Sequence, residues 1–191
     1  SGITDSDCRI VEFPVTDKNQ SQQFASLLLE KAKPSITIAI ERCGLTRDGS
    51  YLNMLGQEIT AYNAKTDYLF SQKIPSVGIG DGGNEIGMGN VVTEIAKVPT
   101  LVATPCVTKT TDLVISSVSN WGCYGLIAAI SIQKGENLLP SVANQANLIR
   151  QCVHHGAVDG ITALPEYKVD GFTLHENSLA LSAMLELLNT E

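Results

Sequence analysis

The sequence predicts an α/β fold: a three-layer Rossmann-like domain with a mostly parallel sheet and a small C-terminal β-hairpin. Strand-like segments alternate with helix-like segments along the chain, as parallel sheets require, because helices connect their strands. Some strand-like runs, above all 35–41, are apolar throughout, which is typical of strands buried on both faces. We expect residues 1–191 to form one such domain, since this length can bury a substantial core.

The first half of the chain alternates β-branched runs with segments of helical periodicity. Short apolar runs predict strands, and a capping residue ahead of an amphipathic run predicts a helix start. Thr16 or Asp17 is such a cap, and Phe24, Leu27 and Leu28 form the inward stripe of the helix that follows. The elements expected in this half are strands at 9–15, 35–41 and 76–80, and helices from the cap to 33, at 59–73 and at 84–97.

The second half continues the alternation and adds a hairpin. Ser119 and Asn120 precede an apolar segment of helical length, so we expect them to cap a helix. The segment 160–174 has two short extended runs around a turn at 165–171, the pattern of a β-hairpin. The other elements expected here are strands at 100–105 and 112–118, and helices at 121–134, 141–155 and 177–189.

The charge of the chain argues against nucleic-acid and membrane partners. The formal net charge is −7 and the 13 Lys and Arg residues are scattered, whereas nucleic-acid binding needs a cationic face. Residues 113–133 carry no charge, but serines, an asparagine and glycines interrupt the run. A buried strand followed by a buried helix explains this run better than a membrane span does.

Cysteine usage predicts a reducing intracellular compartment. The five cysteines are dispersed and form no C-x-x-C pair, which is typical of reduced thiols rather than of a disulfide framework. The first ten residues have neither the basic start nor the apolar run of a signal peptide. We therefore expect the cytoplasm if the source is bacterial and the mitochondrial matrix if it is eukaryotic.

The segment 76–90, SVGIGDGGNEIGMGN, combines a phosphate-binding pattern with two acidic residues that would repel a phosphate. Residues 78–83 match GxGxxG, the turn of dinucleotide-binding folds. A bound pyrophosphate would face Asp81 in the turn and Glu85 in the first turn of the expected helix. Two like charges about 4 Å apart at an effective dielectric of about 20 repel by roughly 4 kcal/mol, which cancels the attraction of a helix N-terminus. The sequence therefore disfavours a dinucleotide.

The same turn suits a cation. Gly82 and Gly83 let the backbone pass close to a small ligand, and we expect Gly82 to adopt a positive φ. Asp81, Asn84 and Glu85 offer oxygens to an ammonium group or to a divalent cation, Mg²⁺ or Mn²⁺. The alternative for Glu85 is that it only complements the dipole of the expected helix.

Polar residues also follow three of the expected strands, and ligands of open α/β sheets collect at such strand ends. The first group is Glu41 and Arg42, the second is the turn at 81–85, and the third is Ser119 and Asn120. Glu41 is a further carboxylate for the site or for a metal, unless it only pairs with Arg42. The Arg42 guanidinium can hold a substrate carboxylate, and the third group can donate hydrogen bonds from a helix start.

Four motifs occur in the order AIERCG, VGIGDGGNEIGMGN, SVSNWGCYGL and VDGFTLHENS. In this order and spacing they resemble the D-glutamate cyclase family, and the likeness runs from about residue 10 to the C-terminus. The resemblance implies a lyase that converts D-glutamate to 5-oxo-D-proline with loss of water. The resemblance implies a further α/β segment upstream in relatives, which we expect to be absent here, either removed or never present in a short member. Any ligand group from that segment would then be missing.

Closing a lactam needs a base for the ammonium group, stabilisation for a poor electrophile, and a substrate that is held folded. We expect Asp81 or Glu85 to bind the ammonium and take its proton, with Glu41 as a further catalytic carboxylate. His175, ahead of the last expected helix, can shuttle protons. The other expected substrate contacts are Arg42, Gly82, Gly83, Asn84, Ser119 and Asn120.

Two other functions fit the same residues. A hydrolase or phosphoryl-transfer enzyme can hold Mg²⁺ among Glu41, Asp81 and Glu85. A non-catalytic amino-acid-binding module is the other, because ligand groups from an upstream segment would be missing. The expected partner of the cyclase is a small amino-acid substrate, and a homo-oligomer is left open.

Overall fold

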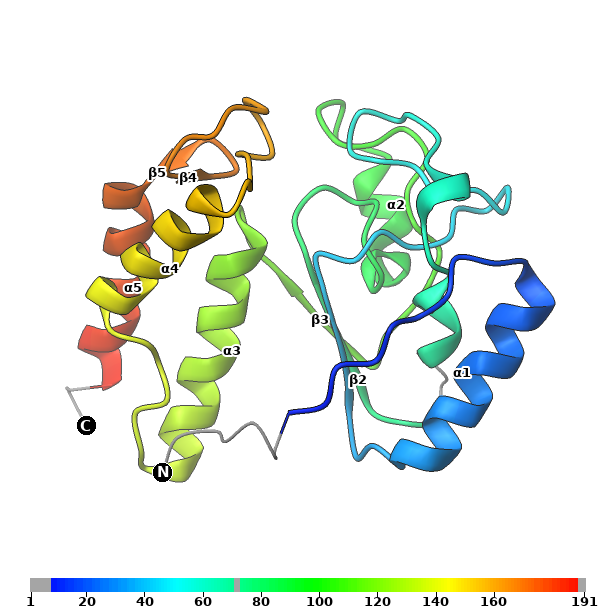
Figure 1. Cartoon of the computed structure of the whole chain (residues 1–191), viewed down its shortest axis with the longest axis horizontal. Coiled ribbons are helices and arrows are strands. Elements are labelled where there is room, and N and C mark those ends of the chain that lie inside the picture. The colour runs from blue at the N-terminus through cyan, green and yellow to red at the C-terminus, as the bar shows by residue number, and fades with distance from the viewer. Residues whose placement is uncertain (1–7, 71–72, 189–191) are drawn as a thin grey trace. The chain divides into compact units, whose positions relative to one another are not determined.

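The computed structural model describes residues 8–70 and 73–188 (Figure 1). Its sheet consists of the parallel strands β1 (Thr37–Ile40), β2 (Ser76–Gly80) and β3 (Asp112–Ile115), in the order β1-β2-β3. Strands β4 (Lys168–Val169) and β5 (Phe172–Thr173) form an antiparallel hairpin near the C-terminus. The predicted fold class, α/β with a parallel sheet and a C-terminal hairpin, is confirmed.

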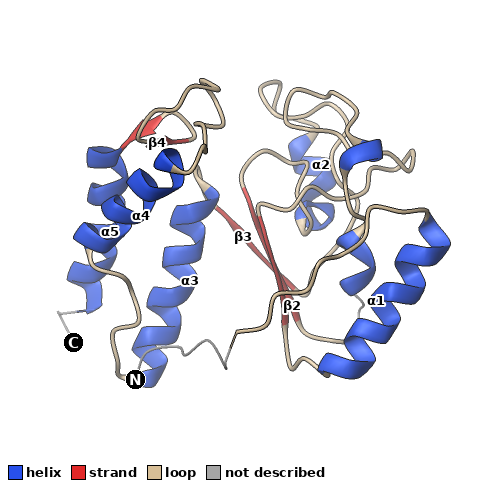
Figure 2. Ribbon diagram, in the orientation of Figure 1, coloured by secondary structure: helices blue, strands red, loops and turns tan. Residues whose placement is uncertain are grey.

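The α-helices are α1 (Lys18–Ala32), α2 (Val92–Ile95), α3 (Ser119–Lys134), α4 (Val142–His154) and α5 (Leu174–Leu188) (Figure 2). Short 3₁₀ helices occur at η1 (Thr60–Tyr62), η2 (Thr66–Leu69) and η3 (Met88–Val91). The chain divides into two compact units: the first comprises residues 1–78 and 82–113, and the second comprises residues 79–81 and 114–191. That the whole chain forms a single domain stays a prediction.

Helix α1 begins where the sequence predicts. The Asp17 carboxylate accepts a hydrogen bond from the Gln20 amide at 2.9 Å and caps the helix. The predicted inward stripe is wrong at Leu27, which is 65% exposed. The helix packs against η2 and buries the small residues Ser21 and Ala25, because small side chains allow the closer approach.

Residues 9–15 and 100–105 form no strands, contrary to prediction. Pro14 and Pro105 each lack the backbone N–H that a strand ladder would use. The side chain of Val102 is buried in a hydrophobic cluster of the first unit. The second of these segments therefore contributes to the core of the first unit without joining the sheet.

The apolar sequence of β1 predicts a strand buried on both faces, but the structure shows burial on one face only. Ile38 is 44% exposed and Ile40 is 54% exposed, whereas Ala39 between them is buried. Side chains alternate across a strand, so one face of β1 is packed and the other is exposed. The apolar run therefore predicted the strand correctly, but the prediction that both of its faces are buried is wrong.

Two predicted helices of the first unit are reduced to short turns. The segment 59–73 contains only η1 and η2 among its described residues, and positions 71–72 lie outside them. The segment 84–97 contains η3 and the short α2. Gly87 has a φ of 106°, which a right-handed helix does not allow, so no helix begins at Asn84.

The helices of the second unit lie close to their predicted ranges, but the predicted hairpin turn at 165–171 is wrong, because β4 occupies 168–169 and only 170–171 connect it to β5. Helix α5 packs against α3 and α4 (Figure 1). The core of this unit includes Ala128, Leu139 and Leu181. Helix α5 begins earlier than predicted because Thr173 and Glu176 form a reciprocal cap. The Thr173 amide donates to Glu176 Oε2 at 2.8 Å, and the Glu176 amide donates to Thr173 Oγ1 at 3.3 Å. No helix among the described residues combines the length and apolar character needed to cross a membrane.

Candidate functional site

The glycine turn that follows β2 holds the carboxylate of Glu85. Its Oε1 accepts a hydrogen bond from the Gly82 amide and its Oε2 accepts one from the Gly83 amide, each at 2.7 Å. Glu85 is 2% exposed, so these charge-assisted bonds are shielded from bulk water. Successive backbone N–H groups form the concave anion cradle that a phosphate occupies in other glycine-rich turns. In this chain the cradle is filled by the protein's own carboxylate.

Glu85 does not lie in a helix, so the alternative that it complements a helix dipole is wrong. The helical turn η3 begins only at Met88. Glu85 forms an isolated β-bridge with Cys43, and the Ile86 amide donates to the Arg42 carbonyl at 2.8 Å. The turn is thereby joined to the segment that leaves β1.

The residues of this segment that adopt a positive φ are Gly83 and Gly87, not Gly82. Gly83 has a φ of +98° and Gly87 a φ of +106°. The prediction of a positive φ at Gly82 is wrong, because this residue is not among those in the left-handed region. A Cβ at Gly82 would lie 3.3 Å from Glu85 Oε1. Gly82 thus keeps space beside the bound carboxylate.

Asp81, the first residue after β2, is held by the first turn of α3. Its Oδ2 accepts hydrogen bonds from the Ser119 amide at 3.1 Å and from the Ser119 hydroxyl at 3.2 Å. Ser119 is buried and Asp81 is partly exposed. The predicted capping role of Ser119 and Asn120 is wrong, because Val118 is the N-cap residue and no side chain caps the helix. Ser119 instead orients a carboxylate.

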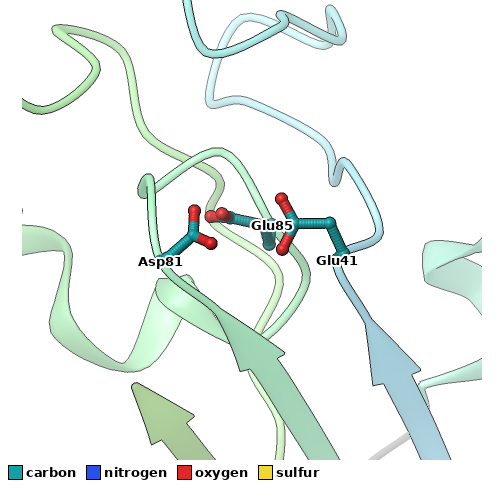
Figure 3. A group of neighbouring side chains, drawn as sticks. All are labelled: Glu41, Asp81 and Glu85. Carbon is teal, nitrogen blue, oxygen red and sulfur yellow. The ribbon is translucent and has the colours of Figure 1, made fainter. Parts of the chain in front are cut away.

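Glu41 is the first residue after β1 and has a φ of +51°, a region that non-glycine residues enter at a cost of about 1–2 kcal/mol. Glu41, Asp81 and Glu85 each offer one carboxylate oxygen, and these oxygens all lie within 4.8 Å of one another. Figure 3 shows the three side chains converging from the ends of β1 and β2 and from the turn after β2. Grouped carboxylates of this kind suit an ammonium group or a hard divalent cation such as Mg²⁺ or Mn²⁺.

Arg42 and Asn84 bind loops of the first unit. The Arg42 guanidinium donates from Nε to Thr66 Oγ1 at 3.2 Å and from Nη2 to the Ala64 carbonyl at 2.8 Å. The Asn84 side chain donates to the Leu52 carbonyl at 3.1 Å. Both residues therefore fix the loops around the acids. That either of them also contacts a substrate stays a prediction.

Asn120 and His175 are exposed residues of the second unit. Asn120 lies in the first turn of α3, where it lines a pocket. His175 lies inside the first turn of α5, not ahead of the helix as predicted. Hydrogen bonds from Thr173 lower the pKa of the neighbouring Glu176, and the charge of His175 adds to this effect. The role of His175 as a proton shuttle stays a prediction.

Asp67, which the sequence did not single out, organises the segment after β1. Its Oδ1 accepts hydrogen bonds from the Leu45 amide at 2.8 Å and from the Thr108 hydroxyl, and its Oδ2 accepts one from the Tyr51 hydroxyl at 2.6 Å. Burial, and then the charge of Asp67, raise the pKa of Tyr51, so the phenol remains a donor. The three partners are 16 to 41 positions away in sequence. No local motif could therefore have revealed this residue.

Burial disfavours the two thiols near the turn, Cys43 and Cys106, as nucleophiles. Burial raises the pKa of Cys43, whose Sγ donates to the Leu52 carbonyl at 3.1 Å. Burial also raises the pKa of Cys106 to about 12. Because the thiolate is the reactive form, burial disfavours both thiols as nucleophiles, and the carboxylates are the better candidates for chemistry at this turn.

Two comparisons with known proteins bear on these residues. The family model described as D-glutamate cyclase-like, C-terminal, matches residues 2–185. The human protein named D-glutamate cyclase, mitochondrial, is 31% identical, in a match that covers 72% of this chain and 27% of that protein. The chain thus spans little more than a quarter of the length of this curated relative.

Proposed function

The chain belongs to the D-glutamate cyclase-like family, and we propose that it is a lyase that converts D-glutamate into 5-oxo-D-proline and water. The observation that carries the proposal is the group formed by Glu41, Asp81 and Glu85, whose oxygens lie within 4.8 Å of one another. An amino acid enters this reaction as an ammonium ion, and the group supplies the negative charge that attracts it. The human relative is named for this activity.

We assign the proton transfer to Asp81. Both oxygens of Glu85 accept backbone hydrogen bonds at 2.7 Å in a buried position, so Glu85 serves as a fixed negative charge. Glu41 is exposed and meets the ammonium group from solvent. Asp81 is partly exposed, and Ser119 fixes its orientation through Oδ2. A carboxylate with a defined orientation is what general base catalysis requires.

The reaction forms a bond between the amine nitrogen and the side-chain carboxyl carbon of the same molecule. One oxygen of that carboxyl group leaves as water. The ammonium group loses two protons in total, and both depart with this oxygen, so the reaction consumes no net acid. Asp81 takes a proton from nitrogen and returns it to the departing oxygen. Holding the substrate folded supplies much of the rate, because ring closure is intramolecular.

The test is to incubate the full chain with D-glutamate, and separately with L-glutamate, and to follow lactam formation by NMR. We expect 5-oxo-D-proline from the D-enantiomer. Asp81→Asn should lower turnover by about 10²–10⁴-fold while circular dichroism shows an intact fold. Near-native turnover in this variant would remove Asp81 from the mechanism.

The same three carboxylates favour a second candidate, a hydrolase or phosphoryl-transfer enzyme that uses Mg²⁺ or Mn²⁺. Asp and Glu oxygens are ligands that both ions accept, and each residue of the group offers one. Chelation separates the candidates. A phosphatase activity that disappears on chelation, with D-glutamate untouched, supports the hydrolase. Lactam formation that survives chelation supports a cyclase without a metal, and lactam formation that needs the ion supports a cyclase with one.

A non-catalytic amino-acid-binding module is a third candidate, because the chain spans 27% of the human relative. Binding of D-glutamate without lactam formation would support it. The compartment and the oligomeric state are proposals as well. The five cysteines, all of them among the described residues, are not joined by disulfides. This suits a reducing compartment: the cytoplasm for a bacterial source, or the mitochondrial matrix for a eukaryotic one. Light scattering in solution tests for a homo-oligomer.

A further inference from the structure

A small pocket lies in the second unit among α3, α4, β4 and α5. Its volume is about 170 Å³, below the roughly 300–1,000 Å³ of sites for drug-sized ligands. Helix α4 contributes the aliphatic side chains of Leu148, Ile149 and Val153. We call this cavity the α4 pocket. Its polar groups come from Asn120, Tyr124, Gln145, Cys152, Lys168 and Asn177.

The α4 pocket is lined by one cation, although the chain as a whole is acidic. The chain has a net charge of −7, but none of the described Asp and Glu residues lines this pocket, whereas Lys168 does. The Lys168 ammonium forms an ion pair with Glu166 and donates to its Oε2 at 3.0 Å. A lysine ammonium has three donors, so donors remain for an anionic ligand group. The pocket therefore favours a ligand with a carboxylate.

Gln145 supplies the second recognition element. This residue is 3% exposed, and its Nε2 donates to the Asn177 carbonyl at 3.4 Å. Its Oε1 is buried and accepts no hydrogen bond from the described residues. Buried acceptors without a donor are uncommon and destabilising. A ligand that brings an N–H group to Oε1 would satisfy this acceptor.

The wall beside Gln145 is fixed before any ligand arrives. Asn177 is 1% exposed, and its Oδ1 accepts a hydrogen bond from Trp121 Nε1 at 2.9 Å. Its Nδ2 donates to the carbonyls of Phe172 at 3.0 Å and Thr173 at 2.9 Å. All the donors and the acceptor of the Asn177 side chain are therefore engaged. Because the Asn177 side chain is already held in place, less conformational entropy is lost when a ligand binds.

We propose that the α4 pocket binds a small carboxylic acid that carries an N–H donor. The carboxylate pairs with Lys168, the N–H group donates to Gln145 Oε1, and the carbon skeleton packs on the aliphatic side chains of α4. Two molecules of the proposed reaction have this chemistry, D-glutamate and 5-oxo-D-proline, and naming them rests on the proposed function.

The experiment uses the thiol of Cys152, an exposed cysteine that lines the pocket. The full chain is alkylated with iodoacetamide with and without 5-oxo-D-proline, and each cysteine is followed by peptide mass spectrometry. We expect saturating ligand to slow alkylation of Cys152 roughly tenfold. The exposed Cys8 of the first unit is the internal reference, and its rate should not change. Unchanged alkylation of Cys152 would overturn the proposal.

Two variants test the recognition groups. Gln145→Leu and Lys168→Met should each raise the ligand concentration needed for protection by roughly tenfold or more, because each loses one polar contact. Gln151→Leu is the matched control, since Gln151 is an exposed residue of the same helix outside the pocket. Protection of Cys152 at an unchanged concentration in both test variants would also overturn the proposal.

The Asp81→Asn variant separates this inference from the proposed function and allows D-glutamate to be tested without turnover. Protection of Cys152 by either compound in this variant supports the pocket, even if the wild-type chain forms no lactam. Lactam formation by the wild-type chain without protection by either compound leaves the proposed function standing and overturns the pocket.

Discussion

The two units of the chain are ordered by different interactions. The second unit consists mainly of three long helices around apolar side chains, with Leu181 fully buried among them. In the first unit, buried carboxylates hold irregular segments: Asp67 binds three groups from distant positions, and Glu85 binds two amides of the glycine turn. Most of the candidate site thus lies in the first unit, where hydrogen bonds to irregular backbone stabilise the structure. The helices of the second unit are stabilised mainly by apolar packing.

The largest effect is expected in the apolar core of the second unit. Leu181→Ala should lower the free energy of unfolding by about 3 kcal/mol, because it leaves a cavity among well-packed side chains. Urea denaturation measures this. Leu179→Ala, at a residue of the same helix that is 57% exposed, should change the value by less than about 0.5 kcal/mol. A loss below about 1 kcal/mol at Leu181 would mean that apolar packing does not dominate this unit.

A somewhat smaller effect is expected at the polar centre of the first unit. Asp67→Asn keeps the shape of the side chain but removes its charge and one acceptor, so we expect a loss of about 2 kcal/mol. Asp48→Asn, at an exposed position of the same unit, is the matched control and should be nearly neutral. If the two variants proved equally stable in urea, the hydrogen bonds of Asp67 would not hold this unit.

Alkaline pH should also weaken the first unit. Burial raises the pKa of Cys106 from its ordinary value of 9.0 to about 12, so above pH 9 the folded state keeps a proton that the unfolded state loses. The stability from this group is complete below about pH 9 and is lost as the pH rises toward 12. We expect a loss on the order of 1 kcal/mol at pH 10 relative to neutral pH. Urea midpoints of the wild type and Cys106→Ala at both pH values test this, and identical pH dependence would contradict it.

The smallest effect on stability is expected where Ser119 orients Asp81. Ser119→Ala removes the hydroxyl but keeps the amide donor, so the loss should be about 1 kcal/mol. Turnover should fall roughly tenfold with little change in KM, because the base is less well oriented. Ser117→Ala, at an exposed residue, should leave both quantities unchanged. A fall in stability without a fall in turnover would reduce Ser119 to a structural residue.

The second unit was largely predictable because its signals are local. Helix α4 begins after Ser141, whose hydroxyl accepts a hydrogen bond from the Asn144 amide at 3.1 Å, and a cap of this kind is visible in the sequence. The predictions for the first unit fail where distant contacts decide. Helical periodicity at 84–97 says nothing of the positive φ at Gly87, and the apolar run 100–105 has no strand partner to extend the sheet.

The candidate site shows the same division. Glu41 and Asp81 could be predicted as neighbours because each follows a strand of one parallel sheet. The binding of Glu85 by the amides of Gly82 and Gly83 could not be predicted. The GxGxxG pattern is the same whether a side chain of the protein or an outside anion occupies the turn. Gln145 has no sequence signature either, because what marks it is a buried acceptor that receives no hydrogen bond from the described residues.

One consequence of the Glu85 cradle concerns how this protein responds to its surroundings. Glycine-rich turns elsewhere offer their backbone amides to an anion from outside the chain, such as a phosphate. This turn carries its counter-charge in its own covalent chain, two and three residues from the amides that bind it. The amides of the turn are therefore engaged as soon as the chain folds, and no outside anion is needed to hold their geometry.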